Sequence, residues 1–200
     1  DLRAASGQLV ADLRQIQTLA FSNQPFQVCS STTGSGLSFG SPCTSDSQCG
    51  AGAPNSCGLV PAGGYGLTLS VCTTSPCQYQ LYGDAGNGVL TGDVPEKFDG
   101  QLSTGPDFSD PILRTVTLPP KISIKSIIVN ATTQVLSTFS VNVIPPKPTT
   151  SFTYDDSGAL ITTGVRVSFC LEHEQSHLRR LVTMVAASGQ VTDKVVPNCS

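Results

Sequence analysis

The residues best suited to chemistry lie at 173–177, where the chain reads His-Glu-Gln-Ser-His. On a helix this spacing places two imidazoles one turn apart as zinc ligands, and the glutamate activates a water. The flanking segments do not favour a helix, because 164–171 alternates like a strand and 178–185 is rich in β-branched residues. The chain has no third histidine, and no glutamate follows the motif. We therefore expect a hairpin turn, with a zinc metalloprotease using His173 and His177 as the remote alternative.

A second set of possible ligands lies in the glycine-rich stretch 84–93. Asp84, Asn87 and Asp93 could gather oxygen atoms around Ca²⁺. The stretch lacks the alternating carboxylates and the closing glutamate of a calcium loop, and the same residue types form an ordinary β-turn. We keep these three residues as calcium candidates and expect no cofactor.

Basic residues near the C-terminus offer a possible contact with DNA or a protein partner: Arg179, Arg180 and Lys194. Adjacent side chains on a strand point to opposite faces, so only one of the two arginines would meet a given surface. Neighbouring carboxylates also offset their charge. The chain has neither a nucleophile motif nor a phosphate-binding glycine loop, so we do not expect an enzyme.

The cysteines indicate an oxidising compartment. Their number is even, they are irregularly spaced, and none forms a C-x-x-C pair. We expect disulfides among the eight: Cys29, Cys43, Cys49, Cys57, Cys72, Cys77, Cys170 and Cys199. Because the chain shows no signal peptide, we expect that an N-terminal targeting or membrane segment precedes Asp1.

The elements that must position these residues are one helix and many strands. Residues 1–23 carry an apolar stripe with a spacing of three or four, and Asn23-Gln24-Pro25 ends the helix. The stripe comprises Leu2, Ala5, Leu9, Leu13, Ile16 and Ala20, with Arg3, Asp12, Arg14, Gln15 and Gln17 lying off it. A single helix ahead of a strand-rich chain is expected to lie against a sheet.

Strands are expected at 26–30, 65–73, 78–82, 112–118, 122–129, 138–144, 164–171, 178–186 and 190–196. The segment 30–64 is rich in Ser, Gly, Thr and Pro, and we interpret it as a loop insertion held by disulfides. The 200 residues suit one α+β domain, with residues 1–23 as the helix and 65–200 as the β-rich region. Charge is uneven: 30–110 holds seven acidic residues against one lysine, whereas 111–150 holds four basic residues and no acid. Such asymmetry could guide an assembly interface.

One stretch resembles the segment that follows the membrane-spanning half-helix of type IV pilin-like proteins: residues 8–29, QLVADLRQIQTLAFSNQPFQVC. It is most similar to the GspH/FimT group of minor pilins and pseudopilins. Their pattern of L-x-x-D-L-R, a later alanine and an N-x-P turn is filled here by Leu9, Asp12, Leu13, Arg14, Ala20, Asn23 and Pro25. Similar turn and strand motifs occur at 81–93, 152–158, 165–170, 180–185 and 187–191.

The resemblance implies a pilin-like fold and a structural role. Such proteins are anchored in the bacterial inner membrane by an apolar N-terminal helix, face the periplasm, and then assemble with other pilins through the inner-membrane machinery. Minor members initiate or cap type IV pili or type II secretion pseudopili. FimT-like members active in DNA uptake bind DNA through a G-R-x-R tail, but 189–192 reads Gly-Gln-Val-Thr, so DNA binding is not carried over. A pilus-tip subunit that contacts DNA or a surface is the alternative function. Pilins often close a C-terminal loop with a disulfide, so the resemblance also implies that Cys170 pairs with Cys199.

Overall fold

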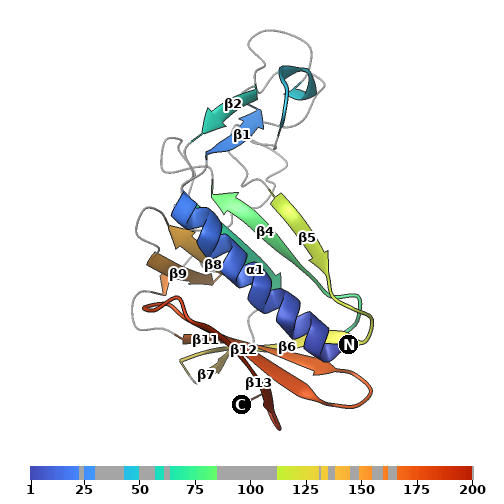
Figure 1. The fold of residues 1–200 in the computed structure, drawn as a ribbon. Helices are drawn as coiled ribbons and strands as arrows, with labels where there is room; N and C mark the ends of the chain where they lie inside the picture. Colours follow the sequence, from blue (N-terminus) through green and yellow to red (C-terminus); the bar gives the residue numbers. More distant parts are fainter. Residues whose placement is uncertain are drawn as a thin grey trace.

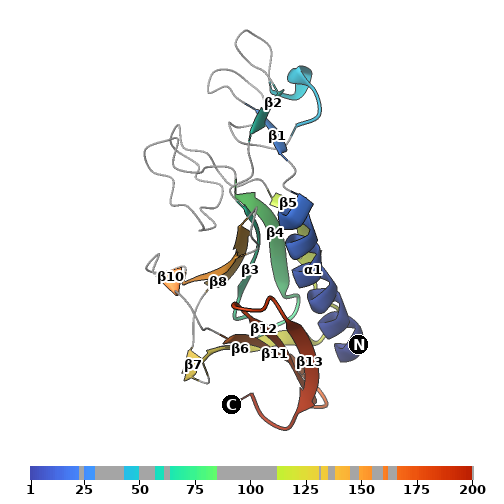
Figure 2. The same ribbon diagram turned by 60° about the vertical axis from the view of Figure 1, so that its left-hand side comes forward.

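In the computed structural model, one helix lies across two antiparallel sheets (Figures 1 and 2). The structure describes residues 1–22, 25–29, 43–49, 57–60, 64–84, 112–130, 132–134, 138–144, 149–154, 160–161 and 166–199. Helix α1 (Leu2–Ser22) contacts strands of both sheets. The α+β class predicted from the sequence is therefore confirmed.

The first sheet has six strands in the order β10-β9-β8-β3-β4-β5. They are β3 (Gly64–Ser70), β4 (Gln78–Asp84), β5 (Ile112–Thr117), β8 (Thr138–Ile144), β9 (Thr149–Tyr154) and β10 (Leu160–Ile161). The second sheet has five strands in the order β13-β12-β11-β6-β7. They are β6 (Ile122–Val129), β7 (Thr132–Gln134), β11 (Arg166–His173), β12 (Arg179–Val185) and β13 (Val191–Val196).

Three of these strands, β7, β9 and β10, were not predicted from the sequence. They are short, at three, six and two residues. Two of them pair with a strand that the pattern did predict, β7 with β6 and β9 with β8, and β10 pairs with β9 at the edge of the sheet. Tertiary pairing rather than local periodicity therefore defines them.

The helix buries the predicted apolar stripe in a core shared by both sheets. Ala5, Leu9, Leu13, Ile16 and Ala20 are all buried, and Leu2 is half-buried. The two sheets meet beneath the helix, where the rings of Phe139 (β8) and Phe169 (β11) pack edge to face at 6.0 Å between centroids. A backbone bridge between Cys72 and Ile124 also joins the first sheet's connecting loop to β6.

A separate lobe lies beyond the C-terminal end of α1, at the opposite end of the helix from the chain's N-terminus (Figures 1 and 2). It pairs β1 (Phe26–Cys29) with β2 (Cys57–Val60) and includes the 3₁₀ helix η1 (Asp46–Cys49). The insertion predicted over 30–64 is held by two disulfides, and it also contains β2 and η1, two short elements that the sequence pattern did not predict.

The cysteines form four disulfides: Cys29–Cys49, Cys43–Cys57, Cys72–Cys77 and Cys170–Cys199. Disulfide bonding is thus confirmed, including the C-terminal pair that the family resemblance implies. In the described part of the chain, no helix combines the length and apolar character needed to cross a bilayer.

Candidate functional site

The His-Glu-Gln-Ser-His motif forms the hairpin between β11 and β12, as predicted. His173 ends β11, residues 174–176 form the turn, and the His177 N–H donates to the His173 carbonyl at 2.9 Å. His177 has a left-handed backbone (φ 53°) and a side chain that is 71% exposed. The His173 Nδ1 atom lies 3.2 Å from the Ser176 backbone N–H, within the same turn. The two imidazoles are therefore not carried one turn apart on a helix, which the zinc chemistry of this motif requires.

Glu174, the residue that the motif would use as a general base, holds the hairpin in place. Its backbone N–H donates to the Lys121 carbonyl at 2.9 Å, and its Oε1 atom accepts from the Ser75 N–H at 3.1 Å. The carboxylate is therefore bound to the connection between β3 and β4.

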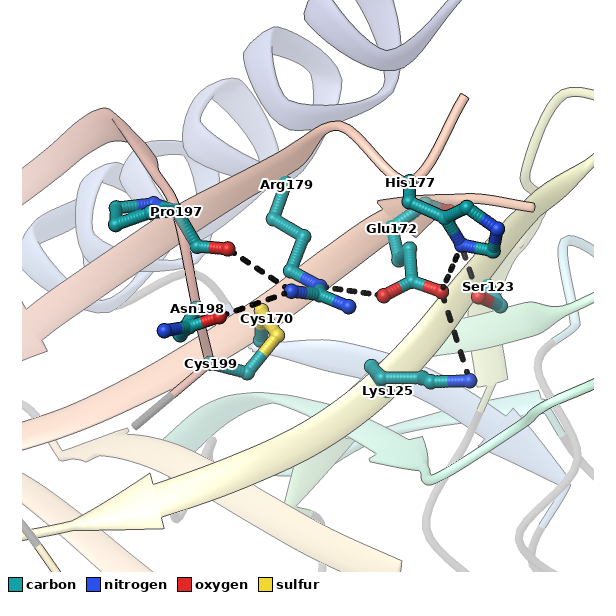
Figure 3. Close-up of a disulfide and its surroundings, with 9 residues drawn as sticks. All are labelled: Ser123, Lys125, Cys170, Glu172, His177, Arg179, Pro197, Asn198 and Cys199. Atoms are coloured by element: carbon teal, nitrogen blue, oxygen red, sulfur yellow. Dashed lines mark hydrogen bonds and ion pairs between the residues drawn. A yellow bond between two sulfur atoms is a disulfide. The ribbon is translucent and has the colours of Figure 1, made fainter. Parts of the chain in front are cut away.

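Glu172 lies on the face of the second sheet turned away from α1, where three basic side chains surround its carboxylate (Figure 3). It is 3% exposed and accepts a 2.5 Å hydrogen bond from Arg179 Nε. Lys125 Nζ lies 3.6 Å and His177 Nδ1 3.5 Å from its Oε1 atom. Burial raises the pKa of Glu172, but the Arg179 hydrogen bond and the Lys125 charge outweigh burial and hold its pKa below the ordinary value.

The same arginine fixes the C-terminal tail beside the disulfide. Arg179 Nη1 donates to the Pro197 carbonyl at 2.9 Å and lies 3.3 Å from Asn198 Oδ1 (Figure 3). Cys199 in that tail is bonded to Cys170 on β11. Arg179 therefore uses its donors inside the domain, which leaves fewer of them for a polyanion than the sequence pattern suggested.

Arg180 faces the helix, on the opposite side of the sheet from Arg179, as strand alternation predicts. It forms a double contact with Asp193 on β13, with Nε at 3.0 Å and Nη2 at 2.9 Å. The Ser6 hydroxyl of α1 donates to the same carboxylate at 2.9 Å. Lys194 is exposed on β13. The three basic candidates therefore do not form one patch: the two arginines lie on opposite faces and each is bound to a carboxylate.

A buried carboxylate on α1 was missed from the sequence. Asp12 was placed off the apolar stripe, yet it is 2% exposed and contacts the first sheet. Its oxygens accept from Tyr79 Oη at 2.6 Å and from Gln8 Nε2 at 2.9 Å, and it forms an ion pair with Arg114 on β5. Burial, followed by the hydrogen bond and charge of Asp12, raises the pKa of Tyr79 above its ordinary value.

One signal could have identified Asp12 as buried. It lies three residues after Leu9 and four before Ile16, so it shares their side of the helix. Beside this contact a groove of about 460 Å³ runs between α1 and the edge strand β5. Its lining includes Ala4, Gln8 and Arg114.

The calcium candidates are only partly within the described chain. Asp84 is buried at the end of β4, where its Oδ2 atom accepts from Asn142 Nδ2 at 3.0 Å. Asn87 and Asp93 lie outside the described residues. Among the residues that the structure describes, the groups close enough to share a metal reduce to Cys29, Cys43 and Cys49, whose sulfurs are bonded in disulfides.

The arrangement as a whole serves attachment: polar contacts fix the helix to both sheets, the hairpin to the β3–β4 connection, and the C-terminal tail to the second sheet. Helix α1 is anchored by Asp12 on one side and by Ser6 on the other. Comparison of the chain with protein-family models, with curated proteins and with solved structures found no match in any of the three.

Proposed function

We propose that this chain is the head domain of a minor pilin or pseudopilin of the GspH/FimT kind, a structural subunit of a type IV pilus or type II secretion pseudopilus. The observation that carries the proposal is the attachment of α1. One long helix lies along both sheets and is bound to the first by a buried hydrogen bond and to the second by a part-buried one. A subunit held in a filament through its N-terminal helix needs sheets that stay firmly bound to that helix.

The arrangement of the ends is consistent with this role. The N-terminal end of α1 lies at the opposite end of the helix from the disulfide-bonded lobe (Figures 1 and 2). In the proposed filament the helix would lead into the membrane and later the filament core, and the lobe would lie at the far end of the head. Before assembly the protein would be anchored in the inner membrane with this domain in the periplasm.

The polar contacts favour a structural role over catalysis or DNA binding. The glutamate of the hairpin motif caps a loop, and Arg179 and Arg180 are bound to Glu172 and Asp193. A DNA-binding surface usually presents several clustered cations to solvent.

Gly7 offers a test that separates assembly from folding. It lies exposed on α1, and a Cβ atom added there would meet nothing within 4 Å. We expect Gly7→Glu to leave the isolated domain folded, because the new side chain points into solvent. In the proposed filament the same charge would face a neighbouring subunit.

The experiment compares full-length Gly7→Glu with wild type in the native host, where sheared surface filaments and secretion are assayed in a strain lacking the gene. Thr192→Glu, an exposed substitution on β13, is the matched control. We expect the gene deletion to impair filament assembly or secretion, and Gly7→Glu but not Thr192→Glu to fail to restore it. Normal filaments and secretion in the deletion strain would contradict the proposed function.

A further inference from the structure

In the lobe that contains β1 and β2, the buried cluster consists of cysteine side chains. Among the side chains described there, the buried ones are Cys29 at 0%, Cys43 at 5% and Cys49 at 4% exposure, and Cys57 packs against them. A segment this small buries too little apolar surface to hold its own fold, and depends on cross-links or a metal. The state of these four cysteines therefore decides whether the lobe is folded.

Three of the four lobe sulfurs lie close enough together to share one metal ion. The Sγ atoms of Cys29, Cys43 and Cys49 all lie within 4.8 Å of one another, and the Cys57 sulfur is bonded to that of Cys43. In a tetrahedral zinc site with Zn–S bonds of about 2.3 Å, the sulfurs are about 3.8 Å apart. Three of the lobe sulfurs therefore lie near the spacing of a thiolate zinc site, and Cys57 would become available as the fourth ligand once its bond to Cys43 is broken.

The backbone supplies these sulfurs from paired, ordered segments. Cys29 on β1 and Cys57 on β2 are direct cross-strand partners, and Cys49 ends the helix η1. The Cys43 N–H donates to the Gln27 carbonyl at 3.0 Å, which fixes Cys43 against β1. The Asp46 carboxylate accepts from the Cys57 N–H at 2.7 Å and links η1 to β2. These contacts bring the segments that carry the four cysteines together.

The charge of the surrounding sequence favours a metal over four free thiolates. The chain contains no lysine or arginine between Arg14 and Lys97, so the residues near the four cysteines in sequence supply no cation to stabilise ionised sulfur. A divalent metal would offset this charge directly.

We propose that the reduced chain binds one Zn²⁺ through Cys29, Cys43, Cys49 and Cys57, and that this tetrathiolate site alternates with the two disulfides. Binding converts four thiols and Zn²⁺ into a Zn–S₄ centre of charge −2 and releases four protons. Oxidation forms the two S–S bonds, releases Zn²⁺ and gives up four electrons. Two molecules of an oxidant that carries a disulfide accept those four electrons together with four protons, and each becomes a dithiol. The proposal does not rest on the filament role.

The test uses the full chain, reduced with a phosphine under anaerobic conditions, incubated with Zn²⁺ and freed of excess metal by gel filtration. We expect one zinc per chain. Alkylation followed by mass mapping should show the four lobe cysteines protected, and Cys72, Cys77, Cys170 and Cys199 modified. Because this readout follows each cysteine separately, it remains informative if the reduced chain is only partly folded. Substitution of Co²⁺ should give the intense visible absorption of a tetrahedral thiolate site.

Two double variants form a matched pair, because each removes one disulfide. Cys43→Ser with Cys57→Ser should weaken zinc binding by more than the roughly 10–100-fold loss typical of changes outside the ligand set. Cys170→Ser with Cys199→Ser should bind zinc as wild type does. The proposal is overturned if the reduced wild type retains no zinc, if all eight cysteines are protected equally, or if the two variants lose zinc to the same extent.

Discussion

Replacing Tyr79 by phenylalanine removes one hydroxyl group from the buried contact between α1 and the first sheet. The ring keeps its place in the core, so no large cavity is created. The lost interaction is the 2.6 Å hydrogen bond from Tyr79 Oη to Asp12, and both residues are 2% exposed. A hydrogen bond to a charged group contributes about 1.5–3 kcal/mol, and full burial favours the upper part of that range.

The ion pair to the same carboxylate should matter less. The Arg114 side chain is 43% exposed, so solvent screens its charge. We expect Arg114→Met to cost about 0.5–1 kcal/mol, as partly exposed ion pairs do. Tyr79→Phe should cost about 2–3 kcal/mol, which for a domain of this size corresponds to a fall of about 4–12 °C in Tm.

The assay is urea-induced unfolding with the disulfides intact, followed by far-ultraviolet circular dichroism because the chain has no tryptophan. Repeating Tyr79→Phe in an Asp12→Asn background gives the control. The acceptor is then neutral, and the cost of losing the hydroxyl should fall to about 0.5–1.5 kcal/mol. The reasoning is refuted if Arg114→Met costs more than Tyr79→Phe, or if the cost of Tyr79→Phe is the same in both backgrounds.

Three further outcomes follow from the contacts. The pKa of Tyr79 is raised, so the folded state keeps the phenol protonated while the unfolded chain ionises near pH 10.0. The free energy of unfolding should therefore fall as pH rises above that value. Measured across the tyrosinate titration, it should fall more in wild type than in Tyr79→Phe. The lowered pKa of Glu172 contributes stability above its ordinary value of 4.5 that is lost as pH falls through the folded pKa, so denaturation measured from pH 7 to 3 should be less pH-dependent in Glu172→Gln. Gly66→Ala should cost about 1–3 kcal/mol in urea unfolding, because its Cβ would overlap the Tyr82 ring, whereas Gly58→Ala has nothing within 4 Å and should not carry that cost.

Local periodicity was enough to predict most of the framework. The strands expected at 122–129 and 138–144 match the observed bounds, and the helix ends at Ser22, one residue before the prediction. The hairpin at 173–177 was predicted because 164–171 alternates like a strand and 178–185 is rich in β-branched residues. In each case the signal is carried by residues close together in the chain.

Contacts between distant segments could not be predicted in the same way. Strand β9 has the sequence TTSFTY and becomes a strand by pairing with β8. The partners of the lobe cysteines depend on how β1, η1 and β2 meet, since six cysteines allow fifteen connectivities. The Arg180–Asp193–Ser6 contact joins three elements, and Ser6 is separated from Asp193 by 187 residues.

The misplacement of Asp12 has a geometric cause. A helix on one flat sheet buries a narrow stripe, but α1 lies across two sheets, which widens the buried arc. At about 100° per residue, Asp12 and Ser6 lie about 60° to either side of the centre of the apolar stripe. Asp12 faces the first sheet and Ser6 the second, each bound to a polar group there. Gln17 follows the same rule, because it lies on the Ser6 side and its Nε2 atom donates to the Gly189 carbonyl at 2.6 Å, in the β12–β13 turn. Polar residues at the two margins of an apolar stripe are thus the residues that fix the helix between two sheets.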